Sequence, residues 1–214
     1  MSGSVAVRRV SNERMRAAIR HLKAADPVLG AIIDRVGPCR LQLREPTFET
    51  LARSIVYQQV SGKAAASILA RVQQAVGSRF TARAILRLTP EELRSCGLSK
   101  QKTGYILDLA EKVALRQVNF RKLALLSDEE VIEHLTQVKG VGVWTVQMFL
   151  MFALERPNVF PHADLGVRNA IHRAYNLSET PKPADLLRIS QPWHPYCSVA
   201  TWYLWRSLEG AAGI

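Results

Sequence analysis

The chain has 214 residues, of which 48% are hydrophobic and 22% are charged, a composition that is typical of a globular protein and excludes a disordered or fibrous one. Lysine and arginine number 29 against 18 acidic residues, so the net charge of +11 favours a polyanionic partner such as nucleic acid. No stretch approaches the roughly 20 uninterrupted apolar residues of a membrane-spanning helix, and we therefore expect no membrane partner.

The N-terminal segment and the cysteines bear on the cellular compartment. MSGSVAVRRV has its arginines after a weak apolar patch, whereas a signal peptide has the charge first and then about 7–15 apolar residues. We therefore expect a cytoplasmic protein. Cys39, Cys96 and Cys197 are odd in number and widely spaced, which favours three reduced core residues over a disulfide framework or a metal-ligand set.

Signals for helix starts and stops recur along the chain. Thr89-Pro90-Glu91-Glu92 and Ser127-Asp128-Glu129-Glu130 each combine an N-cap residue with a glutamate three positions later, which is the capping-box pattern. Other N-caps and C-terminal glycines delimit the remaining segments. The expected helices are 11–24, 48–58, 62–76, 90–96, 100–115, one from 128, 165–175 and 195–208.

Strand signals are nearly absent. Only Cys39 to Leu43 alternates like a strand, and that segment is too short to found a sheet. Prolines at 157–161 and 181–195 mark places where we expect helices to end. The fold class is therefore predicted to be all-α, with roughly ten helices joined by short connections.

The segment L-T-Q-V-K-G-V-G-V-W over 135–144 predicts two helices joined by a very tight turn. Gly140 and Gly142 allow the backbone to turn sharply and to approach another molecule closely. At the start of the second helix, unpaired N–H groups and the helix dipole suit the turn to hold a phosphate, and Lys139 adds a positive charge. From these glycines alone, an ordinary packing corner is the alternative.

Asp164 lies 22 residues after the second glycine, in F-P-H-A-D-L-G-V-R and just before the expected helix from 165. For an isolated aspartate in this position, capping that helix is the simplest role. Capping does not exclude a part in chemistry.

In order and spacing, several segments resemble the helix–hairpin–helix DNA glycosylases, and specifically the 3-methyladenine DNA glycosylase II (AlkA-type) family. They are S-I-V-Y-Q-Q-V-S at 54–61, G-L-S-K-Q-K at 97–102, L-T-Q-V-K-G-V-G-V-W-T at 135–145, V-F-P-H-A-D-L-G-V at 159–167 and W-H-P-Y-C-S-V-A-T-W-Y-L-W at 193–205.

The resemblance implies one glycosylase unit over 1–214, a two-lobed helical bundle without an N-terminal β domain. Lobe A would cover about 47–156, with the helix–hairpin–helix at 128–155. Lobe B would cover about 1–46 plus 158–214 and would contain Asp164. DNA would bind in the cleft between the lobes.

By the same resemblance, Asp164 is the catalytic carboxylate. Breaking an N-glycosidic bond builds positive charge on the sugar, which a carboxylate stabilises while it helps to position the attacking water. Related enzymes that also nick the strand have a lysine where this chain has Trp144. Without that amine no Schiff base forms by the family route, so we expect a monofunctional enzyme that leaves an abasic site.

The resemblance also implies residues that contact DNA and the excised base. The base-pocket candidates are Trp144, Met148, Trp193 and His162, although core packing for the tryptophans and a backbone contact for the histidine are the ordinary alternatives. The DNA-binding candidates are Lys139, Gly140, Val141, Gly142, Gln58, Gln59, Val60, Ser61 and Arg168. Trp202 and Trp205 are expected in the core of the last helix.

Two details of the resemblance concern the loop 58–61 and the hairpin. AlkA-type enzymes have a leucine where this chain has Gln59, so either Gln59 or Val60 is the wedge that fills the gap in the duplex. The backbone carbonyls of Thr136, Val138 and Val141 would hold a structural alkali cation. We expect no required cofactor, and no iron–sulfur cluster with only three scattered cysteines.

We therefore expect a monomeric DNA repair enzyme that binds duplex DNA through the minor groove and the phosphate backbone. It would flip out an alkylated purine such as 3-methyladenine or 7-methylguanine, hydrolyse its N-glycosidic bond, and act on the nucleoid of a bacterial cytoplasm. Two alternatives stay open: a glycosylase for deaminated or mismatched bases, and a non-catalytic DNA-binding module in which Asp164 only caps a helix.

Overall fold

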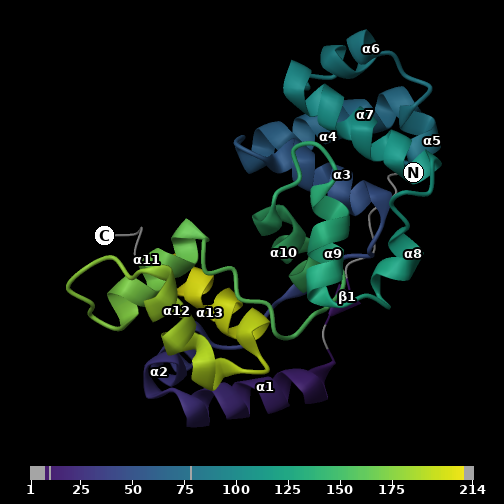
Figure 1. Ribbon diagram of the computed structural model, residues 1–214. Helices are drawn as coiled ribbons and strands as arrows, with labels where there is room; N and C mark the ends of the chain where they lie inside the picture. Colours follow the sequence, from purple (N-terminus) through teal and green to yellow (C-terminus); the bar gives the residue numbers. More distant parts are fainter. Residues whose placement is uncertain (1–7, 10, 78, 210–214) are drawn as a thin grey trace. The chain divides into compact units, whose positions relative to one another are not determined.

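The computed structural model describes residues 8–9, 11–77 and 79–209, and most of them are helical (Figure 1). The all-α prediction is confirmed. None of the helices in this described part is both long and apolar enough to cross a bilayer.

The chain forms two compact units. Among the described residues, one contains 44–77 and 79–149, and the other contains 8–9, 11–43 and 150–209. The resemblance implied a boundary between the lobes near residue 156. In the structure, the chain passes from the first unit to the second a few residues earlier, within the helix α10 (Val143–Phe152).

The first unit is built around two helices that pack against each other, α3 (Phe48–Tyr57) and α7 (Lys100–Ala114). Helix α4 (Gly62–Val76) packs against α3, and α5 (Ala82–Ile85) and α6 (Pro90–Ser95) pack against α7. The short helix α8 (Phe120–Leu123) follows, and the unit ends with a helical hairpin formed by α9 (Asp128–Thr136) and the start of α10.

The N-caps expected in this unit are formed by side-chain hydrogen bonds. Ser61 accepts from the N–H of Ala64 at 3.3 Å, and Ser99 accepts from the N–H of Lys102 at 3.2 Å. Both capping boxes are complete, at the starts of α6 and α9. Each such cap contributes about 1 kcal/mol, so these starts are encoded locally in the sequence.

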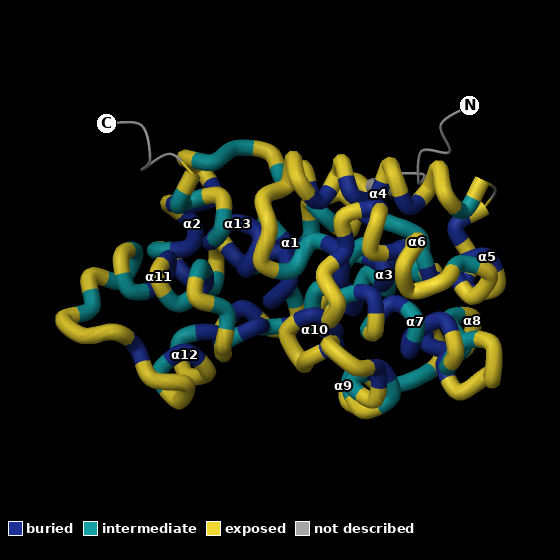
Figure 2. Tube along the Cα trace, turned by 90° about the horizontal axis from the view of Figure 1, so that it is seen from above, coloured by how far each residue is buried: buried dark blue, intermediate teal, exposed yellow. Residues whose placement is uncertain are grey.

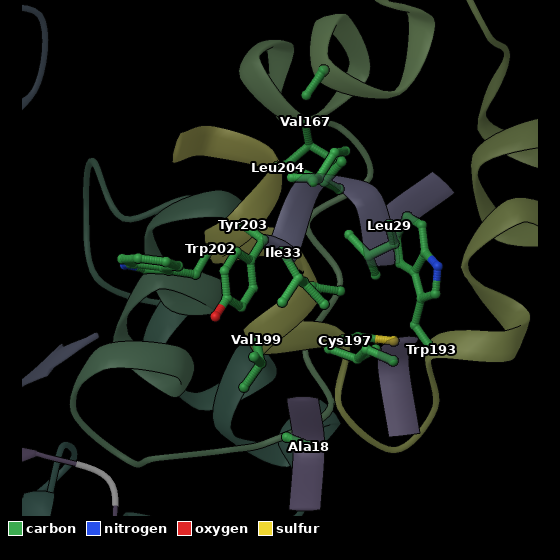
Figure 3. Packing of buried hydrophobic residues seen from close by; sticks show 14 of the residues in the cluster. Ala18, Leu29, Ile33, Val167, Trp193, Cys197, Val199, Trp202, Tyr203 and Leu204 are labelled. Carbon is green, nitrogen blue, oxygen red and sulfur yellow. The ribbon is translucent and has the colours of Figure 1, made fainter. Parts of the chain in front are cut away.

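The second unit consists of α1 (Asn12–Ala25), α2 (Pro27–Val36), α11 (Leu165–Ala174), α12 (Pro183–Ser190), the 3₁₀ helix η1 (Gln191–Trp193) and α13 (Cys197–Glu209). Helix α13 packs against α2 and α11, and its first eight residues are all buried, as the dark blue tube shows (Figure 2). Side chains from these helices gather in one apolar cluster (Figure 3).

The structure differs from the sequence-based expectation at several elements of this unit. Two helices were not foreseen, α2 and α12, and each has a proline at its first turn, where the missing N–H is harmless. Pro183 therefore starts a helix rather than ending one. The last helix begins at Cys197, two residues later than expected. Of the segment Cys39 to Leu43, which alternates like a strand, only Gln42–Leu43 forms a strand, β2. It pairs antiparallel with β1 (Arg8–Arg9).

A buried carboxylate organises the middle of the second unit. Asp26 is 7% exposed; its Oδ1 caps α2 by accepting from the N–H groups of Val28 and Leu29. Its Oδ2 accepts from the hydroxyl of Tyr175 and, at 2.7 Å, from Nε1 of Trp193. Burial, together with the neighbouring Asp26, raises the pKa of Tyr175. These hydrogen bonds satisfy the buried charge and hold Trp193 in the core.

The three cysteines are free thiols. Burial raises the pKa of Cys39 to about 11 and that of Cys197 to about 12. Both thiols therefore stay protonated near neutral pH, as expected of packing residues.

Candidate functional site

The tight turn of the first unit joins α9 to α10, as Figure 1 shows. The N–H of Val138 donates to Leu135 O at 3.1 Å, and the N–H of Val141 donates to Val138 O at 3.0 Å. The carbonyl of Gly142 accepts from Val146 N at 3.1 Å and so begins α10. The N–H groups of the first turn of α10 point out of the helix start, where intrahelical acceptors end.

The two glycines of the turn have different surroundings. Gly140 has φ +76°, and a Cβ there would overlap the ring of Tyr105 on α7. Apart from its two chain neighbours, Gly142 has no described protein atom within 4 Å of the position of a Cβ. The fold itself therefore requires Gly140 to be glycine, whereas the space beside Gly142 is open to an approaching ligand.

The buried side chain of Asp108 holds the turn through a hydrogen bond to its main chain. Oδ2 of Asp108, on α7, accepts from the N–H of Lys139 at 2.9 Å. Its Oδ1 lies 3.2 Å from Nζ of Lys112 and 3.7 Å from Nζ of Lys139. The Lys139 side chain is 74% exposed, so its distant ion pair contributes little. The ammonium of Lys139 stays accessible to an anion at the turn.

Val141 presents neither its side chain nor its N–H for the DNA contact expected of it. Its side chain is buried, and its N–H is already bonded within the turn. It packs the turn against the core, which leaves Lys139, Gly140 and Gly142 as the exposed residues of the turn.

The loop 58–61 connects α3 to α4 in the same unit. Nε2 of Gln58 donates to Gly140 O at 2.9 Å and lies 3.5 Å from Thr145 Oγ1. Gln58 is therefore turned toward the hairpin rather than toward solvent. Gln59, with φ +54°, and Val60, 39% exposed, are the outward residues of the loop, while Ser61 caps α4.

Two of the expected base-pocket residues lie on α10. Trp144 stands in its first turn and is 46% exposed, which is unusual for so large an apolar side chain. Met148 is half-buried one turn later. An exposed indole beside the turn is suited to stack on a base.

The carbonyls expected to hold a cation belong to Thr136, the last residue of α9, and to Val138 and Val141 in the turn. Val138 O accepts the N–H of Val141, and no backbone hydrogen bond in the described part of the chain ends on the carbonyl of Thr136 or Val141. These oxygens fit a hard cation in donor type. Across the residues that the structure describes, no group of three or more His, Cys, Asp or Glu side chains could hold a metal.

In the second unit, Asp164 is the N-cap of α11. Its Oδ1 accepts from the N–H of Val167 at 2.8 Å and from Nε1 of Trp205 at 2.9 Å. The residue is half-buried. Asp164 therefore caps a helix, and a second donor from α13 also fixes its carboxylate.

The contact between Asp164 and Trp205 depends on Gly166. A Cβ at Gly166 would lie 3.1 Å from both Asp164 Oδ1 and Trp205 Cδ1, tighter than almost all real contacts. On its other side, Trp205 stacks on Phe152, with ring centroids 6.1 Å apart and planes 20° apart. The ring is thereby held in the orientation that points its N–H at the carboxylate.

Trp193 lies in the core, and Trp205, which packs against the core cluster, also contacts Asp164. Trp193 is fully buried, bonded to Asp26 and set edge-on to Phe160 at 5.5 Å, so it is a core residue and not a pocket wall. Trp205 is half-buried and contacts Asp164. Trp202 lies in the core as expected, against Tyr203.

The other two candidates of this unit flank Asp164 in sequence. The ring of half-buried His162 lies 6.4 Å from that of Phe160. Arg168 follows on α11, and its Nε is buried without an acceptor among the described residues. That nitrogen is not presented to solvent, which weighs against a phosphate contact through it.

Replacing Trp205 with phenylalanine tests the importance of its N–H. The ring and its stacking on Phe152 are kept, but the donor to Asp164 is lost. A hydrogen bond to a charged group contributes about 1.5–3 kcal/mol, so we expect any reaction that uses Asp164 to slow about tenfold or more. The rate constant under saturating enzyme is the measurement.

Trp202→Phe is the matched control, one helical turn away on α13, where the Trp202 ring packs against Tyr203. It removes the same N–H from a tryptophan of the same helix and should leave the rate within about twofold. Equal effects of the two substitutions would show that Trp205 acts only through packing.

Residues 52–195 match the family described as "HhH-GPD superfamily base excision DNA repair protein". DNA-3-methyladenine glycosylase 1 of Schizosaccharomyces pombe is 34% identical over 87% of this chain and 85% of its own length.

Two solved structures are similar in fold. One is the 3-methyladenine DNA glycosylase of Schizosaccharomyces pombe in complex with abasic DNA, with a TM-score of 0.77 and 33% identity, covering 88% of this chain and 95% of that one. The other is the DNA-3-methyladenine glycosidase of Bacillus halodurans, with a TM-score of 0.77 and 35% identity, covering 92% and 89%.

Proposed function

Because the chain belongs to the HhH-GPD superfamily of base excision DNA repair proteins, we propose that it is a DNA glycosylase that excises alkylated purines from duplex DNA. The substrates would include 3-methyladenine, which the names of its relatives give, and 7-methylguanine. The observation that carries the proposal is Asp164, whose carboxylate is held by donors from two helices beside a glycine that makes room for them.

Asp164 acts on the sugar of the excised nucleotide. The bond between C1′ and the purine nitrogen breaks, and its electron pair leaves with the base. An alkylated purine carries a positive charge and so departs as a neutral molecule. The carboxylate stabilises the positive charge that develops on the sugar, orients the water that adds to C1′ and accepts the proton that this water loses. The products are a free base and an abasic site.

The first unit binds the DNA. Lys139 and the N–H groups at the start of α10 hold the phosphate backbone, and the open space beside Gly142 admits a phosphate oxygen. Gln59 and Val60 enter the minor groove, and Trp144 stacks on a base. The carbonyls of Thr136, Val138 and Val141 hold an alkali cation that supports the turn, and one chain acts as a monomer.

The enzyme is monofunctional. Trp144 occupies the place from which the lysine of lyase relatives attacks the sugar, and an indole cannot form a Schiff base. The nearest amine in sequence, Lys139, lies in the turn that faces phosphate. Hydrolysis therefore ends at the abasic site, without cleavage of the strand.

The test is incubation of the purified protein with methylated and with unmethylated duplex DNA. We expect release of 3-methyladenine and 7-methylguanine from methylated DNA alone, and strand breaks only after treatment with alkali. Breaks before alkali, or a covalent adduct trapped by borohydride, would contradict the monofunctional mechanism. Absence of base release would contradict the substrate assignment, and duplexes with deaminated bases are the next substrates to test.

A further inference from the structure

Helix α7 contacts both segments of the first unit to which the proposed function assigns DNA binding, the loop that follows α3 and the hairpin turn. Three of its residues, spaced three apart, reach these segments: Lys102 contacts the end of α3, Tyr105 lies against Gly140, and Asp108 accepts from the turn. The spacing of three places them along one side of the helix. The proposed function uses none of the three as a DNA ligand.

Lys102 holds the start of the loop 58–61. Its ammonium donates to Val56 O at 2.7 Å and to Gln58 O at 2.5 Å. These carbonyls belong to the last turn and C-cap of α3, where helical partners are missing and a positive charge is favourable. Burial lowers the pKa of Lys102. The residue therefore satisfies main-chain acceptors instead of standing in solvent as an ordinary phosphate-binding lysine does.

Gln58 joins the loop to the hairpin directly. Its main-chain carbonyl is held by Lys102, and its side-chain amide donates to Gly140 O at 2.9 Å. The same amide nitrogen lies 3.5 Å from the hydroxyl of Thr145 on α10. Gln58 thus bridges the turn and the first part of α10, two segments more than 80 residues away in sequence.

Because Gln58 is bound to the hairpin and Ser61 caps α4, Gln59 and Val60 are the residues of the loop 58–61 that are presented outward. Gln59 adopts a left-handed conformation, with φ +54°, which is uncommon for a residue with a side chain and persists only where the surroundings enforce it. Hydrogen bonds hold the chain on both sides of Gln59 in this conformation. Before it, Lys102 and Gly140 bind Gln58; after it, Ser61 caps α4.

We propose that Lys102 and Gln58 form a latch that fixes the loop 58–61 to the hairpin, so that the wedge and the phosphate-binding turn engage the duplex as one rigid element. Both are positioning residues, not DNA ligands. The inference rests on the proposed function for the identity of the ligand, duplex DNA, but it concerns wedge insertion and not excision.

The test compares Lys102→Met with Lys100→Met. Both remove one positive charge from the first turn of α7, but Lys100 is exposed and the structure gives it no hydrogen bond. Affinity is measured by fluorescence anisotropy at several salt concentrations, for undamaged duplex and for duplex with an abasic site. A 2-aminopurine beside the abasic site reports unstacking as the wedge enters.

For Lys102→Met, we expect the preference for abasic duplex to fall about tenfold and the 2-aminopurine signal to fall with it. The salt dependence of binding to undamaged duplex should not change, because a lysine that contacts phosphate would reduce the slope by about one when removed. Lys100→Met should keep both the preference and the signal.

Gln58→Met is the second variant, because it keeps the length of the side chain, leaves Lys102 in place and removes the donor to Gly140. It should reproduce the loss of preference, and the double variant should lose less than the sum of the two single effects, since both act on one loop. Thermal unfolding establishes that each variant is folded.

Several results would overturn the latch. They are an unchanged abasic preference in both variants, a salt slope reduced by about one in Lys102→Met, or a wild-type protein with no abasic preference. These readouts need no base release, so an inactive protein that shows the expected binding pattern would contradict the proposed function and leave the latch standing.

Discussion

Asp164→Asn is expected to lose most excision activity while the protein stays folded. The Oδ1 of an asparagine can accept both hydrogen bonds that Asp164 accepts, from Val167 and from Trp205, and asparagine is as good an N-cap as aspartate. Only the negative charge is removed. Because that charge stabilises the developing positive charge on the sugar, we expect excision of the alkylated base to slow by about 10²–10³-fold.

The control for this substitution is Asp164→Ala, which removes the cap as well as the charge. It should lower the free energy of unfolding by about 1 kcal/mol, whereas Asp164→Asn should not. Denaturant unfolding of the two variants measures this difference. If Asp164→Asn excised the base within threefold of the wild-type rate, capping would be the sole role of Asp164.

Gly140→Ala is expected to have the largest effect on stability. The left-handed conformation of Gly140 is unfavourable for alanine by about 1–2 kcal/mol, and the added Cβ overlaps the ring of Tyr105. Overpacking of this kind adds about 1–3 kcal/mol. We expect the free energy of unfolding to fall by at least about 2 kcal/mol, as measured by denaturant unfolding, and duplex affinity to fall with it.

Gly142→Ala is the matched control, because its Cβ enters open space. Its effect on unfolding should stay within about 1 kcal/mol, the usual effect of alanine at an N-cap. Its affinity for duplex DNA should nevertheless fall, because the methyl group stands where a phosphate approaches the main chain. A variant that kept full affinity would show that this space is not the phosphate site.

The parts of the fold that the sequence predicted well are those encoded by a few neighbouring residues. Ser61, Ser99 and the two capping boxes start helices where the pattern placed them, because a cap is a contact between residues two or three apart. Proline is less informative. It both ends helices and opens them, so α2 and α12, which have proline in the first turn, were not foreseen.

The candidate site was predictable where a motif fixes the backbone, as in the hairpin and at Asp164. The roles of individual side chains depended on contacts between distant segments. Gln58 faces Gly140, 82 positions away, and Trp205 faces Asp164, 41 positions away. Gly166 was an available signal, since a glycine two residues after a candidate catalytic aspartate indicates close packing by another side chain.

Single-turnover excision from one duplex with a single alkylated purine tests the central claim most directly, with wild-type protein and Asp164→Asn measured in parallel at saturating enzyme. We predict release of the free base by the wild-type protein, and release about 10²–10³-fold slower by the variant at equal affinity for the duplex. Equal rates for the two proteins, or no release by the wild-type protein despite tight binding, would contradict the assignment of this chain as a glycosylase that uses Asp164.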